Sequence, residues 1–101
     1  MKEVARIFRA LTDPTRREIL QSLRDKELPA GEIASRFSIS APAVSRHLSI
    51  LKAAELVTER REGNRIIYRL EHERLSLCLN NFLSSVCPEQ ILRRRKRERV
   101  P

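Results

Sequence analysis

The sequence has no long apolar run, only two cysteines and only two glycines among its 101 residues. No apolar stretch reaches the roughly 18 residues that a membrane-spanning helix needs. The charged residues Lys2, Glu3, Arg6 and Arg9 interrupt the N-terminal segment, which therefore lacks the apolar region of a secretory signal. We expect a cytoplasmic protein without a membrane partner, in which the two cysteines are reduced thiols rather than a disulfide framework.

The motifs of common enzymes are missing as well. The chain has no glycine-rich phosphate loop, no nucleophile elbow and no set of metal-ligand residues. Its two histidines, His47 and His72, lie far apart in segments with other predicted roles, so they do not suggest a general acid and base. The sequence therefore predicts a protein that is not an enzyme and that binds no cofactor.

Positive charge is in excess and unevenly distributed. The net charge is +8, and residues 93–99 alone contain six basic residues and one acid. This distribution predicts one small domain over residues 1–92, followed by a basic, disordered tail over residues 93–101. A core of this size is marginal alone, so burial against a second subunit would stabilise it. The charge favours an acidic partner, nucleic acid first.

The most informative segment covers residues 37–54, which predict a turn followed by a helix from Ala41 to Ala54. Ser40 is a suitable N-cap, and Pro42 falls in the first turn, where its missing N–H costs nothing. Residues 30–37 predict a shorter supporting helix just upstream. One stripe of the longer helix is apolar and faces the core, because Leu48 and Leu51 lie within about 40° of Val44 around the helix.

The opposite face of this helix is small, polar and cationic, as in the recognition helix of a helix-turn-helix protein. Small side chains let such a helix approach base edges closely, while Arg46 can reach a guanine or a phosphate. His47 lies on the flank and is better placed for a phosphate. An ordinary amphipathic surface helix is the alternative. The predicted DNA contacts of this segment are Ser40, Ala41, Pro42, Ser45, Arg46, His47 and Ser49.

Two further helices are predicted before this unit. Apolar residues at helical spacing indicate a helix over about residues 2–11. Asp13 is a natural cap for a second helix that begins at Pro14. Residues 25–29 form a connection. The second helix buries Ile19, Leu20 and Leu23.

Downstream, residues 57–61 and 65–70 predict the two strands of a hairpin, or wing, joined by residues 62–64. Gly63 and Asn64 suit a tight loop with positive φ. One face of the second strand carries Arg65 and Arg69, and the other carries apolar residues, namely Ile66, Tyr68 and Leu70. We expect Arg61, Asn64 and Arg65 to contact DNA; the alternative is a solvated edge strand that resists aggregation.

The last predicted helix covers residues 73–86 and ends before Pro88. Its apolar stripe, like that of the first helix, must be buried against another surface. The two helices together could form a two-fold dimer interface, which would place two recognition helices on a palindromic site. The alternative is that both helices cover their own domain. The predicted interface residues are Val4, Ile7, Phe8, Leu75, Leu79, Phe82, Leu83 and Val86.

Three blocks, residues 10–20, 43–52 and 63–70, occur in the order found in the ArsR/SmtB family of small bacterial winged-helix repressors, which the chain resembles from residue 4 to about residue 86. The resemblance implies a mainly α fold of five helices and a two-stranded wing. It further implies a homodimer that represses transcription by occupying an operator, often that of its own operon.

The chain differs from the metal sensors of that family. Ala34 and Arg36 stand where those sensors carry two cysteines in the third helix, and His72 has no second histidine after it in the last helix. One histidine cannot form a transition-metal site, which takes three or four ligands. The resemblance therefore implies a member without a metal site.

Two alternatives remain open. A thiol-responsive repressor could use Cys78 and Cys87, although nine residues on one helix place them on opposite sides and about 13 Å apart along the axis. That separation excludes a bond within the helix and leaves a bond across a dimer. The other alternative is a non-specific nucleic-acid-binding module in which the tail does most of the binding.

Overall fold

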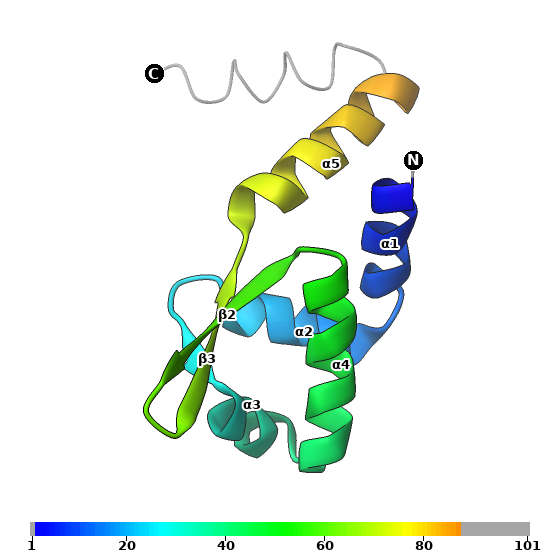
Figure 1. Ribbon diagram of the computed structural model, residues 1–101. Coiled ribbons are helices and arrows are strands. Elements are labelled where there is room, and N and C mark those ends of the chain that lie inside the picture. The colour runs from blue at the N-terminus through cyan, green and yellow to red at the C-terminus, as the bar shows by residue number, and fades with distance from the viewer. Residues whose placement is uncertain (1, 88–101) are drawn as a thin grey trace, which may run out of the picture.

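The computed structural model describes residues 2–87, and the predicted tail and the domain boundary before it lie outside these residues. The described chain is mainly helical with one small antiparallel sheet (Figure 1), which confirms the predicted fold class. The elements are α1 (Lys2–Leu11), α2 (Pro14–Ser22), β1 (Leu28–Pro29), α3 (Ala30–Phe37), α4 (Ala41–Ala53), β2 (Val57–Glu62), β3 (Arg65–Leu70) and α5 (His72–Val86).

Capping side chains define the beginnings of two of these helices. The Asp13 carboxylate accepts a hydrogen bond from the backbone N–H of Arg16 at 3.0 Å, and Pro14 follows as the first residue of α2. The Ser40 hydroxyl accepts one from the N–H of Ala43 at 3.2 Å at the start of α4. Both predicted helix starts are therefore confirmed.

The sheet contains one strand more than the sequence predicts. Its order is β1-β3-β2, with Leu28 opposite Tyr68 and Pro29 opposite Ile67. The prediction of a connection without regular structure over residues 25–29 is therefore wrong at its end. A strand of two residues is too short to show the alternation by which strands are predicted, and the buried side chain of Leu28 fixes this one.

The loop of the wing is also shorter than predicted. Pairing continues to Glu62 and Arg65, so Gly63 and Asn64 alone connect the strands. Gly63 has φ +60°, whereas Asn64 is not among the residues with positive φ, and that half of the prediction is wrong. Glycine first in a two-residue loop is the pattern of a type II′ turn, whose twist matches that of the flanking strands.

The core lies where α4 crosses the other helices and the inner face of the sheet. Val44, Leu48 and Leu51 of α4 are buried, as their spacing predicts, and Ile19 and Leu20 of α2 meet them. In Figure 1 the amino end of α4 lies beside α3 at the lower end of the molecule, and α1 and α5 form the upper end. Among residues 2–87, no helix is long and apolar enough to cross a membrane.

Candidate nucleic-acid interface

The outer face of α4 is exposed along its amino-terminal half. Because the opposite stripe is buried, the small and polar residues of this helix point to solvent. This half of α4 lies at the end of the molecule where α3 joins α4 (Figure 1). Ser38, in the left-handed conformation at φ 51°, makes the tight turn between the two helices. The exposed residues are Ser40, Ala41, Pro42, Ser45, Arg46 and Ser49.

Arg46 is the cationic group on this face. It forms no ion pair or side-chain hydrogen bond with another of residues 2–87, although carboxylates are common on the rest of the surface. A guanidinium group without a protein partner keeps all five N–H donors available. It can therefore donate two parallel hydrogen bonds to a guanine edge or to a phosphate.

His47 lies on the inner flank of α4 rather than on its outer face. Its side chain is 19% exposed, and its Nδ1 atom lies 3.4 Å from Nη1 of Arg16 and 3.9 Å from Oδ2 of Asp13. The backbone N–H of Arg16, with a smaller contribution from His47, lowers the pKa of Asp13. The ring of His47 therefore joins α4 to the start of α2, and its expected DNA contact stays a prediction.

The register of the wing separates its two predicted DNA contacts. Arg61 is opposite Ile66, and Arg65 is opposite Glu62. Since directly opposed residues share a face and successive residues alternate, Arg61 and Arg65 point to opposite faces of the wing. Glu59, two residues before Arg61, pairs with Lys52 of α4. Arg61 is therefore on the same face as α4, and Arg65 is on the far face.

Glu59 is the carboxylate that joins the wing to α4. Its hydrogen bond from Lys52 lowers the pKa of the Glu59 carboxyl, and a hydrogen bond with Tyr68 acts in the same direction. Burial of the Tyr68 phenol, together with the neighbouring Glu59 charge, raises the pKa of Tyr68 to about 12. The ion pair and the buried phenol together hold the wing against the recognition helix.

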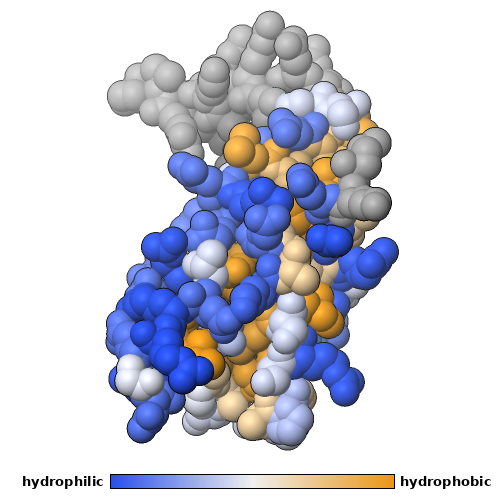
Figure 2. Space-filling view, viewed as in Figure 1, coloured by the Kyte–Doolittle hydropathy of each residue, from blue (hydrophilic) through white to orange (hydrophobic). Residues whose placement is uncertain are grey.

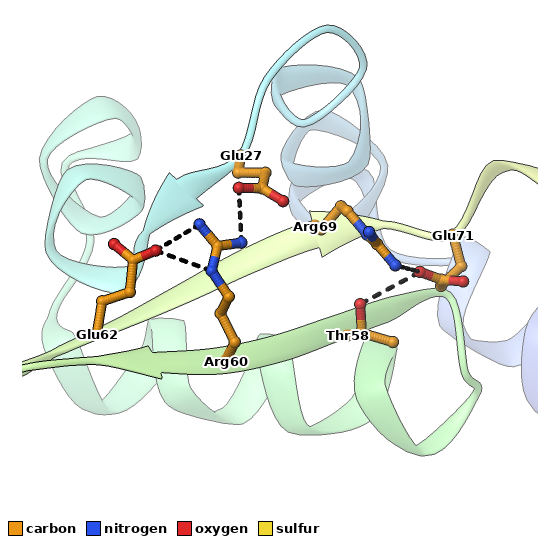
Figure 3. A network of polar contacts seen from close by, with 6 residues as sticks. All are labelled: Glu27, Thr58, Arg60, Glu62, Arg69 and Glu71. Atoms are coloured by element: carbon orange, nitrogen blue, oxygen red, sulfur yellow. Dashed lines mark hydrogen bonds and ion pairs between the residues drawn. The ribbon is translucent and has the colours of Figure 1, made fainter.

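The far face of the wing has an arginine that is already neutralised. Nη1 of Arg60 donates to Glu27 at 2.6 Å, while its Nε and Nη2 atoms donate to one oxygen of Glu62 at 2.9 and 2.7 Å (Figure 3). These two carboxylates raise the pKa of Arg60. Ile67 is opposite Arg60 on this face and is 5% exposed, so the far face of the wing also carries a buried apolar side chain.

Arg69 is held in the same way at the base of the wing. Its Nη2 atom donates to the Glu71 carboxylate at 3.0 Å, and the hydroxyl of Thr58 donates to the same oxygen at 3.2 Å (Figure 3). Two of the four wing arginines are thus ion-paired, while Arg61 and Arg65 form no ion pair with the part of the chain that the structure describes. Sequence alone does not distinguish the two kinds.

A second exposed surface lies at the opposite end of the molecule, over α1 and α5. Figure 2 shows apolar side chains gathered over α5 in the upper part of the view and a hydrophilic surface over the wing at lower left. Phe8 and Phe82 meet edge to face with ring centroids 5.1 Å apart. The five large apolar residues most exposed among those described all lie here: Val4, Leu77, Phe82, Leu83 and Val86.

Ile7 does not belong to this surface. It is 2% exposed and packs in the core of its own domain, so its place in the predicted dimer interface is corrected. Leu77, which is 63% exposed, was not among the predicted residues because it lies off the main stripe of α5. Phe8, Leu75 and Leu79 are half-buried, and α5 has no fully buried residue at all.

The two cysteines both lie on or next to α5. Cys78 and Cys87 are free thiols, both half-buried, and Cys87 lies just beyond the end of α5. Within residues 2–87, no group of three or more histidine, cysteine, aspartate or glutamate residues could hold a metal ion.

Comparison with known proteins gives one consistent result. The profile of the family described as "Bacterial regulatory protein, arsR family" matches residues 13–59. The transcriptional repressor SdpR of Bacillus subtilis is 42% identical over 80 residues, which cover 79% of this chain and 89% of that protein. An arsenical resistance operon repressor of Staphylococcus xylosus is 41% identical over 81 residues, covering 80% and 78%.

A solved structure shows the same likeness in three dimensions. It is an ArsR-like transcriptional regulator from Rhodococcus sp. RHA1, and it superposes with a TM-score of 0.76 at 31% identity, covering 98% of this chain and 92% of that one. The agreement extends over α1 and α5 as well as the helix-turn-helix unit, because nearly the whole chain is covered.

Proposed function

The chain belongs to the ArsR family of winged-helix DNA-binding repressors, and from this premise we propose that it represses transcription as a homodimer on a palindromic operator, that of its own operon. The observation that carries the proposal is the division of α4, which buries its apolar stripe and leaves Arg46 and its small neighbours exposed. The relatives are transcriptional regulators rather than enzymes.

In this proposal α4 enters the major groove by its amino-terminal half. Ser45 and Arg46 contact base edges, and the small residues before them let the helix approach closely. His47 keeps α4 in place against α2. The remaining expected contacts of this helix are Ser40, Ala41, Pro42, His47 and Ser49.

The wing then contacts the backbone or the minor groove beside the same site. Arg61 shares its face with α4, so it has the more direct path to the duplex, and Asn64 lies at the tip. Arg65, on the far face, can reach only a phosphate beyond the tip. The ion pairs of Arg60 and Arg69 leave those two side chains to structural roles.

The α1–α5 surface is assigned to the second subunit. An aromatic pair beside several exposed aliphatic side chains is costly to leave in water, at roughly 25 cal/mol per Å² of apolar area. A two-fold axis through this surface would place two α4 helices on one side of the dimer, as a palindromic operator requires. The proposed residues are Val4, Phe8, Leu75, Leu79, Phe82, Leu83 and Val86.

No observation favours the alternative of a redox-responsive repressor. Cys78 is half-buried between α1 and α5, and Cys87 is half-buried at the end of its helix. A thiol sensor needs an accessible thiolate in a positive environment, and neither residue shows one among the described contacts.

The test is binding to the DNA upstream of the protein's own gene. Fluorescence anisotropy at fixed salt should give an affinity at least about 1,000-fold higher for that DNA than for a scrambled duplex of equal length. Light scattering of the complex should give two chains per duplex. Equal affinity for both duplexes would refute a specific repressor and favour non-specific binding.

A further inference from the structure

A pocket on the flank of α1 and α4 combines an apolar floor with three arginines. Its volume is about 290 Å³. The floor is formed by the last turn of α4, where Ala54 is buried and Ile50 half-buried. No acidic side chain lines it; the lining residues are Arg6, Arg9, Arg16, Ile50, Ala53 and Ala54.

One of these guanidinium groups is fixed in place. Nε of Arg16 donates to the carbonyl of Ala10 at 2.8 Å, and Nη2 donates to the carbonyl of Arg9 at 3.3 Å. These bonds and a contact of Nη1 with Nδ1 of His47 at 3.4 Å orient Arg16, and no carboxylate accepts a hydrogen bond from its guanidinium group among the described residues. Arg6 and Arg9 are exposed, and within residues 2–87 none of the three arginines forms an ion pair with a carboxylate.

Several other arginines on the described surface are paired with carboxylates. Arg60, Arg69 and Arg74 each donate to a glutamate at 2.6–3.0 Å. Three like charges around a pocket repel one another, and an anion bound between them relieves that repulsion. The positive lining therefore favours a negatively charged group, and the apolar floor favours a hydrocarbon portion next to it.

We propose that this pocket binds a small organic anion with an apolar body, such as a medium-chain carboxylate. The carboxylate lies between the arginines of α1 and α2, and the hydrocarbon covers Ile50 and Ala53. The volume is near the lower limit of small-molecule sites, which fits a small ligand.

The pocket is separate from both surfaces of the proposed repressor. On α1, Arg6 lies about 160° around the helix from Val4 and from Phe8, so the proposed dimer surface leaves it open. On α4, the pocket is at the carboxyl end, whereas the proposed DNA contacts are at the amino end. Because the anion touches both α1 and α4, its binding would change operator affinity. This effector role rests on the proposed function, whereas the binding of the anion does not.

The experiment is a titration of the ¹⁵N-labelled full chain with sodium octanoate, followed by amide chemical shifts. We expect saturable shifts centred on Ile50, Ala53 and Ala54. Octanol, which has the same chain without the charge, and acetate, which has the charge without the chain, should each bind at least about tenfold more weakly. Equal binding of octanol, or shifts confined to Phe82 and its neighbours, would overturn the proposal.

The matched variants are Arg6→Gln/Arg9→Gln and, as a control, Arg24→Gln/Lys26→Gln, which removes the same charge from an exposed connection elsewhere. The first should weaken octanoate binding by about fivefold or more, and the control should leave it unchanged. Well-dispersed spectra check that both variants are folded.

A DNA arm separates this site from the proposed function. Octanoate binding without specific operator binding would refute the proposed repressor function and support the anion site. Specific operator binding without octanoate binding would support the repressor function and refute the anion site. If Arg6→Gln/Arg9→Gln instead lowers the salt dependence of DNA binding, the occupant of the pocket is a DNA phosphate and the proposal is wrong.

Discussion

Helices α4 and α5 carry apolar stripes of similar spacing, yet the domain covers only one of them. Val44, Leu48 and Leu51 of α4 are each at most 2% exposed, whereas Phe82 and Val86 of α5 are 45% and 62% exposed. The polar faces also differ, because Arg46 of α4 has no ion-pair partner among residues 2–87, whereas Arg74 of α5 pairs with Glu55.

The difference shows what periodicity can and cannot establish. A repeat of apolar residues predicts which side of a helix avoids water, but not which chain covers it. The apolar stripe of α4 is buried within its own domain, and the opposite face is available to bind DNA. The apolar stripe of α5 is only partly buried, and we assign its exposed part to contact with a second subunit. Four predictions test this comparison.

The largest effect is expected where the stripe is already covered. Leu48→Ala removes a fully buried side chain and leaves a cavity, so it should lower the free energy of unfolding by about 2–5 kcal/mol. Urea denaturation at two protein concentrations measures it, and the loss should be the same at both. A loss below about 1 kcal/mol would mean that α4 is not packed as described.

On α5 the same kind of disruption should act on assembly. Phe82→Glu places a charge in the exposed stripe, and we expect dimerisation to weaken by at least about 3 kcal/mol because that charge would be buried unpaired between subunits. Sedimentation or light scattering measures it. Ser84→Glu adds the same charge about 160° around the helix and should leave the dimer intact. A folded Phe82→Glu protein that remains dimeric would place the interface elsewhere.

Changes on the outer face of α4 should affect DNA recognition without affecting stability. Ser45→Ala and Arg46→Ala should each weaken specific operator binding by about 1–3 kcal/mol if they read bases. The controls Ser76→Ala and Arg24→Ala change exposed residues of the same types elsewhere. Unchanged operator affinity in both test variants would show that another face or helix contacts the DNA.

The smallest effect is expected in the wing, where arginines with and without an ion pair among the described residues can be compared. Arg61→Ala should reduce the slope of log affinity against log salt by about one unit, since one phosphate contact is lost. Arg60→Ala should leave the slope unchanged because Arg60 is neutralised by Glu27 and Glu62. Arg65→Ala should act no more strongly than Arg61→Ala. If the salt slope is the same in all three variants, Arg61 is a solvated residue of an edge strand and does not contact a phosphate.

Local signals in the sequence were enough to predict most of the helices. Asp13 before Pro14 and Ser40 before Pro42 predict helix starts because capping depends only on neighbouring residues. The buried stripe of α4 follows from spacing alone. Ile7 was misassigned because spacing does not distinguish the part of the α1 stripe that packs in the domain from the part that stays exposed.

The arrangement of the candidate site was less predictable because it depends on register and on distant contacts. A three-residue loop over residues 62–64 would set Arg61 opposite Arg65 on one face, whereas the two-residue loop moves them to opposite faces. His47 turns inward because Arg16 and Asp13, more than 30 residues earlier, meet it. No local pattern around residue 47 contains that information.

The pairing of β1 with β3 has a consequence for the order of folding. Leu28 and Tyr68 lie on either side of the whole α3–α4 segment, so the helix-turn-helix unit is the loop that this pairing closes. Closing a long loop costs entropy before any contact repays it, whereas helices and the two-residue hairpin form from neighbours. We therefore expect the helices and the hairpin to form first and β1 to join the sheet last. Separation of the two residues of β1 from β3 would then be the first step of unfolding.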